Sequence, residues 1–402
     1  MTNTEKHKIG LVTATIVGMN AMIGSGIFTI PPKLAINVGP AGILTTILVA
    51  IASWFIAISI ARVATLFPQE GSFYIYAKQW GGHITGIISS SAYLVGLLIA
   101  MGFLTQIAAA YLHDYFPNYS LFTLGSCALL TLIILNMIGV VFSKAGQYVI
   151  ICCTLFPLIA TIIICATKVN LNYLTPFAPH GFTSVFTSTK DVIFAFLGFE
   201  ATASLFSIVK DPEKNVPRAI TYSLTIVAVL YILFISAILL SLPTGTFTDA
   251  KMPITDGLLK VFPTYKWIID GIHIAILSAL LGVLNAIIWS GSKLFLSLVK
   301  NLKNNFAKRL ISSNILNTKT SVLFIGSIIF ISFSTLKTAD LFFSLTALFV
   351  VFAYISAMIT LLTIKEEWKS GQNVKTVIGL ITASVIIMFA AQNLFHEIIK
   401  FI

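Results

Sequence analysis

Eleven apolar segments, each long enough to cross a lipid bilayer, follow one another along almost the whole sequence. About 20 consecutive apolar residues are needed to span the hydrocarbon core as a helix. Only helices and closed barrels satisfy every backbone hydrogen-bonding group in lipid. The sequence therefore predicts an all-α polytopic membrane protein of about 11 spans. The predicted spans are 9–36, 42–66, 84–112, 121–142, 147–168, 189–209, 217–241, 266–299, 320–336, 339–363 and 374–395.

Few charged residues interrupt these segments. Hydrophobic residues make up 57% of the chain and charged residues only 10%, whereas a soluble globular domain carries about 25% charged residues. No low-complexity run or long polar linker separates one part of the chain from another. We therefore expect a single membrane transporter domain over residues 1–402, with the lipid bilayer as its surroundings.

The net charge of +11 is concentrated in the loops between the apolar segments. Cytoplasmic loops of membrane proteins carry an excess of lysine and arginine. If the N-terminus is cytoplasmic, most of the 25 lysine and arginine residues fall on the inner side, including Lys210, Lys214, Arg218 and the cluster from Lys300 to Lys319. The pattern predicts a multi-pass protein of the cell membrane, in a bacterium its inner membrane, with no nucleic-acid partner.

The sequence lacks the motifs typical of enzyme sites. It contains no HExxH, no glycine-rich phosphate loop followed by lysine, and no Gly-x-Ser-x-Gly. The four cysteines lie inside apolar runs without metal-ligand spacing, and the six histidines are dispersed, although Asp270 and His273 are spaced for contact on one helix. We therefore expect no enzymatic activity, no metal and no cofactor.

The first apolar segment is interrupted near its middle by Ile23-Gly24-Ser25-Gly26-Ile27-Phe28. Each glycine lowers helix propensity by about 1 kcal/mol relative to alanine. In hydrocarbon, every backbone N–H and C=O that a break releases must find another partner. We therefore expect this break to lie beside a cavity or a ligand.

A second interruption, Phe196-Leu197-Gly198-Phe199-Glu200, lies in the segment 189–209. The two broken segments occupy corresponding places in two halves of the chain. Such a pair of interrupted segments is the best sequence indication of the binding site in a secondary transporter. The sequence therefore predicts a transporter whose substrate is held between the two breaks.

Glu200 is the only one of the fourteen acidic residues that lies deep in a predicted span. An ionised group at the bilayer centre costs about 2.5–3.5 kcal/mol on insertion scales, so such a residue is a functional candidate by default. We interpret Glu200 as a proton-coupling candidate. The alternative is that released backbone amides of its own break bind the carboxyl group, which then only stabilises the fold.

Several of these motifs together resemble the amino acid, polyamine and organocation transporter family, as found in a bacterial amino acid permease. The similarity rests on Ile23 to Phe28, on Phe196 to Glu200, and on Asp211-Pro212 with Pro217 after the second break. It also includes the connection from Pro68 to Tyr76, and Ser292-Lys293-Leu294-Phe295 with Lys300-Asn301 at the end of the eighth segment. The ordered motifs extend from residue 23 to about residue 301.

This resemblance implies an inverted five-plus-five helix repeat with broken first and sixth helices. Residues 9–168 would form the first repeat, 189–363 the second, and 374–402 an extra C-terminal helix. It also implies secondary active transport of amino acids by alternating access, as a proton-coupled symporter or an amino acid exchanger. A transporter of polyamines or other organic cations is the alternative, and a membrane enzyme or a channel would belong to other classes.

The resemblance also assigns substrate contacts. The amides of Gly24, Ser25 and Gly26 would receive the substrate carboxylate, and carbonyls near Phe194, Ala195 and Phe196 the amino group. Helix dipoles support this arrangement, because a helix start attracts anions and a helix end attracts cations. Tyr93 in the third segment resembles a family residue beside the site, and we count it, Asn285 in the eighth segment and the residues flanking the breaks as substrate-binding too. The complete set is Ile23, Gly24, Ser25, Gly26, Phe194, Ala195, Phe196, Gly198, Tyr93 and Asn285.

Positions in three of the predicted spans inform specificity and coupling. Phe194 occupies the place of an aromatic gate in relatives, whereas Ile287, near Asn285, replaces the tryptophan on which relatives specialised for arginine stack their substrate. A guanidinium substrate is therefore not expected. Phe156 and Pro157 lie where sodium-independent relatives carry a lysine, so proton and sodium coupling both stay open, as do the substrate and the oligomeric state.

Overall fold

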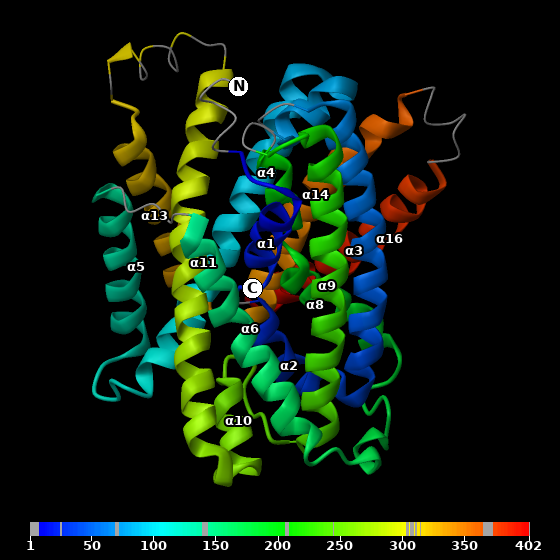
Figure 1. The fold of residues 1–402 in the computed structure, drawn as a ribbon, viewed down its shortest axis with the longest axis vertical. Coiled ribbons are helices and arrows are strands. Elements are labelled where there is room, and N and C mark those ends of the chain that lie inside the picture. Colours follow the sequence, from blue (N-terminus) through cyan, green and yellow to red (C-terminus); the bar gives the residue numbers. More distant parts are fainter. Residues whose placement is uncertain are drawn as a thin grey trace.

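The computed structural model describes residues 8–24, 26–68, 72–138, 144–205, 209–243, 245–302 and 315–364, together with 373–401 and the single positions 305, 309, 312 and 313. Within these residues the regular secondary structure is helical, and the one isolated β-bridge pairs Ile9 with Val209. Figure 1 shows an elongated bundle whose long helices run mostly along one axis. The predicted all-α membrane fold is confirmed.

Long helices account for most of the bundle. The first half of the chain contains α1 (Leu11–Met22), α2 (Gly26–Asn37), α3 (Gly42–Leu66), α4 (Ser72–His113), α5 (Leu121–Ile138) and α6 (Lys144–Ala166). The second half contains α8 (Thr189–Phe196), α9 (Pro212–Ser241), α11 (Lys266–Asn301), α13 (Thr318–Thr335), α14 (Ala339–Leu362) and α16 (Asn373–Phe401). Short helices complete it: η2 (Gly39–Ala41), η3 (Leu171–Leu174), α7 (Thr183–Thr187), η4 (Phe199–Leu205), α10 (Ile254–Val261) and η5 (Pro263–Tyr265).

Eight helices of the described part are long and apolar enough to cross a membrane, and a ninth span results if α1 and α2 are counted as one bent pair. Two predicted spans contain shorter apolar helices: the apolar part of α6, Ile151–Ala166, and α8 followed by η4. The described parts of all eleven predicted segments are therefore mainly helical, while the number that cross the bilayer stays a prediction.

The interior of the bundle is formed by helices that pack on one another along their length. α14 packs mainly on α4, α3 on α9, and α1 on α9, α6 and η4. In Figure 1, α1 (dark blue) lies near the middle of the bundle. Large apolar side chains such as Ile134, Leu233 and Ile381 are exposed on α5, α9 and α16, as expected for surfaces that face lipid tails.

The two ends of the bundle differ in their connections. At one end the backbone N–H of Lys210 donates to the carbonyl of Ile9, so Ile9, just before α1, and Lys210, just before α9, lie together. The other end carries α10 and the loops around it, at the bottom of Figure 1. We call the first the inner end and the second the outer end, following the predicted orientation.

Candidate substrate site

The first break separates α1 from α2. Residue Ile23 leaves the helical region with ψ 71°, and the N–H of Gly24 donates to the carbonyl of Met22 at 2.8 Å. The two helices are bent by 43° relative to each other. Ser25, which the sequence places in the substrate site, lies outside the described residues. The carbonyl of Met22 accepts a second hydrogen bond, from the hydroxyl of Tyr231 at 2.8 Å, which ties the break to α9.

The second break separates α8 from η4. Leu197 is extended, with φ −64° and ψ 144°, and Gly198 has φ 113°. Such a positive φ is readily adopted only by glycine. A Cβ atom on Gly198 would also collide with the carbonyl oxygen of Ala21 on α1. The glycine is therefore required by the backbone conformation and by its neighbour.

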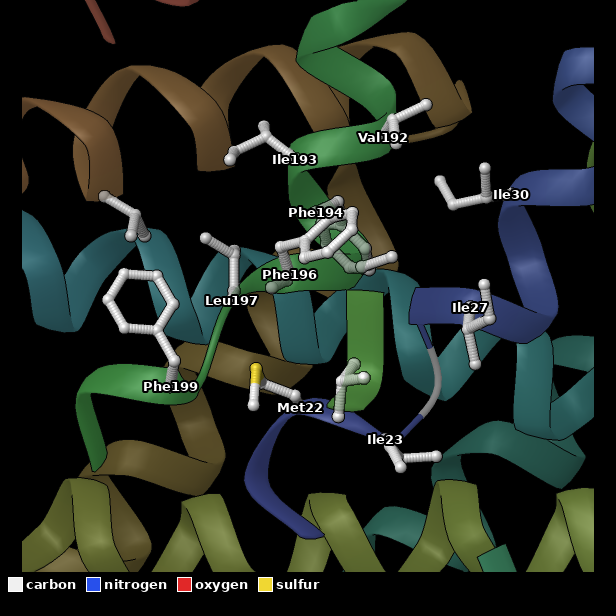
Figure 2. Close-up of a cluster of buried hydrophobic side chains, with 14 of the residues drawn as sticks. Met22, Ile23, Ile27, Ile30, Val192, Ile193, Phe194, Phe196, Leu197 and Phe199 are labelled. Atoms are coloured by element: carbon white, nitrogen blue, oxygen red, sulfur yellow. The ribbon is translucent and has the colours of Figure 1, made fainter. Parts of the chain in front are cut away.

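The two breaks pack directly against each other. A Cβ atom on Gly26 would lie 2.7 Å from the Cα of Ala195 and 3.1 Å from the carbonyl oxygen of Phe194. Gly198 makes the reciprocal approach to α1. Figure 2 shows Met22, Ile23 and Ile27 of the first break near Phe194, Phe196 and Leu197 of the second. The structure thus places side by side the two interruptions that are about 170 residues apart in the chain.

A cavity of about 70 Å³ lies between the two breaks and helices α4 and α11. The breaks contribute the backbone around Gly24, Gly26 and Gly198, and the walls are mostly apolar side chains. None of the described residues that line it is charged. They are Ala21, Met22, Gly24, Gly26, Tyr93, Leu97, Ala100, Met101, Leu104, Phe194, Leu197, Gly198, Val283 and Ile287.

Glu200 lies behind the second break and is 3% exposed. Its Oε1 accepts a hydrogen bond from the hydroxyl of Tyr93 at 2.8 Å. Its Oε2 accepts one from the hydroxyl of Tyr354 at 2.8 Å and one from the N–H of Gly198 at 3.0 Å. The carboxyl group therefore connects α4, α14 and the break itself, and it meets three donors, as a buried carboxylate requires.

A layer of aromatic rings separates the cavity from the outer end of the bundle. The ring centroid of Phe194 lies 4.8 Å from that of Phe343, and Phe343 lies 4.9 Å from Phe103. Phe103 also contacts Phe342, at 5.3 Å. These four rings come from α4, α8 and α14. The arrangement is closed on this side, since Phe103, Phe342 and Phe343 are fully buried.

Comparison with known proteins decides the family. The sequence profile described as "Amino acid permease" matches residues 13–399, nearly the whole chain. The chain belongs to the amino acid permease family. Its broken helices and apolar bundle are therefore those of a transporter of this family.

Three relatives from Bacillus subtilis (strain 168) illustrate the range of named functions. The permease is 26% identical over 62% of its length to the branched-chain amino acid permease BcaP, and 28% identical over 60% to a methylthioribose transporter. It is 26% identical over 58% to the glutamate/serine transporter AimA. The matches cover 58%, 56% and 47% of these relatives, so the chain spans roughly half the length of the curated proteins it matches.

Five of the predicted site residues line the cavity of the permease, and the other described ones do not. Gly24, Gly26, Tyr93, Phe194 and Gly198 are in its wall. The remaining described members of the predicted set that belong to the breaks are buried beside the cavity without lining it; they are Ile23, Ala195 and Phe196.

Asn285 lies off the cavity. Its Oδ1 accepts a hydrogen bond of 2.6 Å from Nδ2 of Asn136 on α5, whereas its helix neighbours Val283 and Ile287 line the cavity. Positions two apart on a helix point about 200° from each other, since each residue advances the helix by 100°. The structure gives no support to Asn285 as a substrate contact.

Sequence reasoning missed the apolar wall of the permease site. Leu97, Met101 and Leu104 recur on α4 at helical spacing with Ala100 between them, and Val283 completes the wall from α11. Such spacing predicts one face of a helix, but a span that is apolar on all sides offers no signal to tell a cavity wall from a lipid-facing surface. Among the described residues, no group of His, Cys, Asp and Glu is placed to hold a metal ion.

Proposed function

We propose that this permease carries zwitterionic amino acids across the membrane by alternating access, and that the cavity between the two breaks holds the substrate. The observation that carries the proposal is the direct packing of Gly26 against Phe194 and Ala195. It places the start of α2 next to the end of α8. The first N–H groups of a helix and its last C=O groups have no partners within the helix. These groups and the helix dipoles match the carboxylate and the ammonium group of one amino acid.

The proposed contacts follow from this geometry. Backbone N–H groups of the first break, from Gly24 through Ser25 to Gly26, would bind the substrate carboxylate. Carbonyls at the end of α8, from Phe194 to Phe196, would bind the ammonium group. Tyr93, whose hydroxyl binds Glu200, would keep the second break in place while the substrate is present.

We further propose that the preferred substrates have small aliphatic side chains. The wall from α4 and α11 is apolar, and an unpaired charged side chain placed against it would lose its hydration. The relative BcaP is named a branched-chain amino acid permease, which agrees with this preference.

Polyamines and other organic cations fit the site less well. They would need carboxylates in the cavity wall, and none of the described lining residues is acidic. The nearest carboxylate, Glu200, already accepts three hydrogen bonds from the protein.

The orientation and the repeat are part of the same proposal. Ile9 and Lys210 lie at the inner end of the bundle, and their basic surroundings favour the cytoplasmic side. Residues 9–168 and 189–363 would form the inverted repeats, with 374–402 as an extra helix, and the matching positions of the two breaks support that division. Proton coupling would act through Glu200. When its carboxylate binds a proton, the protonated oxygen would lose one of the three hydrogen bonds that the carboxylate accepts.

A thermal-shift screen of the purified permease tests the proposed substrate class. A ligand that binds only the folded protein raises the free energy of unfolding by about 2.7 kcal/mol at a concentration 100 times its dissociation constant. We expect valine, leucine, isoleucine or alanine to raise the melting temperature, and putrescine, arginine and glutamate to leave it unchanged. A shift produced by polyamines alone would contradict the proposal.

A further inference from the structure

Four charged side chains meet on the outer side of the aromatic layer. Lys33 of α2 lies 2.9 Å from Oδ1 of Asp340 on α14 and 3.4 Å from Oδ1 of Asp191 on α8. Lys190 of α8 lies 2.7 Å from Asp191 and 3.0 Å from Asp340. Each lysine therefore contacts both carboxylates. We refer to Lys33, Lys190, Asp191 and Asp340 as the charge quartet.

The members of the quartet differ in their access to water. The side chains of Lys33, Lys190 and Asp191 are 2–5% exposed, while that of Asp340 is 37% exposed. Charged side chains that are buried are stable only when they are paired. Asp340 is thus both the member nearest to water and the only member on α14.

A continuous row of contacts joins the quartet to the cavity. Nζ of Lys33 lies 4.5 Å from the ring centroid of Phe343, and this ring lies 4.8 Å from Phe194, which lines the cavity. Asp340 and Phe343 are three residues apart, about one helical turn, at the start of α14. A displacement of this turn would therefore move the aromatic layer and the quartet together.

We propose that the charge quartet is the outer gate of the permease, and that Asp340 is the member that separates when the cavity opens to the outer end. The inference rests on the proposed transport function. Lys190 and Asp191 are neighbours on α8, and Lys33 contacts Asp191, so α2 and α8 stay connected when α14 moves away. The two half-helices that hold the substrate can then keep their mutual packing while the gate opens.

The charges explain why opening and hydration are coupled. In the closed state two cations and two anions balance. When Asp340 leaves, Lys33, Lys190 and Asp191 retain a net charge of +1, which requires water in place of the lost carboxylate. The hydrated passage then presents a positive charge at its entrance. Such a charge attracts the carboxylate of an arriving amino acid.

A cysteine accessibility experiment tests the gate without any substrate. The four native cysteines, Cys127, Cys152, Cys153 and Cys165, are replaced by alanine, and Leu104→Cys introduces a reporter in the cavity wall. A membrane-impermeant maleimide is then applied to intact cells. A separate Lys266→Cys variant, exposed at the outer end of α11, shows that the reagent reaches this side.

We expect Asp340→Asn to raise the labelling rate of the reporter about tenfold or more, because the closed state loses its ionic contacts to α14. The matched control is Asp270→Asn, which removes a carboxylate from an exposed position of α11 and should leave the rate unchanged. If Asp340→Asn is inserted normally and its reporter is labelled at the parent rate, the gate is contradicted.

A second variant covers the case in which the single substitution prevents folding. Lys190→Met with Asp340→Asn leaves Lys33 paired with Asp191 and restores neutrality. Its reporter should be labelled faster than in the parent but more slowly than in Asp340→Asn, since the contacts to α14 are absent and no net charge demands water. Labelling of this double variant at the parent rate would overturn the proposal.

Failure of the gate and failure of the transport proposal give different results. If the reporter responds as expected but no amino acid binds the parent, the gate stands and the proposed substrate is wrong. If amino acids bind but neither variant changes the labelling rate, the transport proposal stands and the quartet is only structural.

Discussion

Gly26 packs so closely on Ala195 that a single added carbon at Gly26 would lie 2.7 Å from the Cα of Ala195. The atoms that this carbon would meet, the Cα of Ala195 and the carbonyl oxygen of Phe194, belong to the main chain and cannot rotate away. The contact explains why an interrupted helix in the first part of the chain depends on an interrupted helix nearly half the sequence later. It also makes the strongest prediction about the site.

Gly26→Ala should weaken amino acid binding by about tenfold or more, since overpacking of this kind costs about 1–3 kcal/mol and 1.4 kcal/mol corresponds to a factor of ten. Isothermal titration of the purified variant measures the change. The matched control is Gly282→Ala on α11, where an added Cβ would meet no atom within 4 Å. Equal affinities for the parent and Gly26→Ala would show that the two breaks do not form the binding site.

Glu200→Gln should lower the stability of the permease by about 1.5–3 kcal/mol, the contribution of a hydrogen bond to a charged group. The glutamine amide can accept on one side only, so at least one of the three donors loses its acceptor. Tyr354→Phe, which removes one donor, should cost less. Thermal unfolding in the same detergent compares the three proteins.

The same Glu200→Gln variant separates the two interpretations of this carboxyl group. If Glu200 carries protons, the variant should still bind the substrate but should lose the pH dependence of uptake, because its neutral state is fixed. Uptake is measured in cells between pH 5 and 8, where the parent provides the reference. An unchanged pH profile would assign Glu200 a structural role and would direct the search for proton coupling elsewhere.

The cavity wall should set the size of the substrate. Ala100→Leu adds three carbons at a buried position of the wall, so it should reduce the affinity for leucine about tenfold more than the affinity for alanine. Val95→Leu on the same helix is the control, since Val95 is 37% exposed and does not line the cavity. Equal losses for both ligands would contradict the assignment of α4 to the side-chain pocket.

The predicted orientation places the two ends of the chain on opposite sides of the membrane. Ile9 contacts Lys210 at the inner end, and Glu397 of α16 contacts Thr338, which precedes α14 at the outer end. Reporter fusions to the N-terminus and to the C-terminus should therefore be active in the cytoplasm and outside it, respectively. Two cytoplasmic ends would contradict a count of eleven spans.

The sequence was sufficient to predict the breaks because glycine pairs inside apolar segments are unusual and have a direct effect on backbone hydrogen bonding. Gly198 illustrates this, since its φ of 113° is a property of one residue. The depth of Glu200 was also predictable from its position within a span. Its partners were not, because Tyr93 and Tyr354 are 107 and 154 residues away and no local pattern connects them.

Rotational position on a helix was harder to predict than helix existence. α11 is apolar on most sides, so hydrophobic periodicity could not decide whether Asn285 or Ile287 faces the cavity. The charge quartet was missed for a related reason. Lys33, Asp191 and Asp340 each lie near the outer end of a different segment, where single charges are common, and only the packing of α2, α8 and α14 brings them together.

Counterflow in liposomes tests the central claim most directly. Purified permease is reconstituted into vesicles loaded with unlabelled leucine, and the uptake of labelled leucine is followed beside Gly26→Ala and Gly282→Ala. We predict saturable counterflow for the parent and for Gly282→Ala, and a strongly reduced rate for Gly26→Ala. Absence of counterflow for the parent with leucine, valine, isoleucine and alanine, or full counterflow for Gly26→Ala, would contradict an amino acid site between the two breaks.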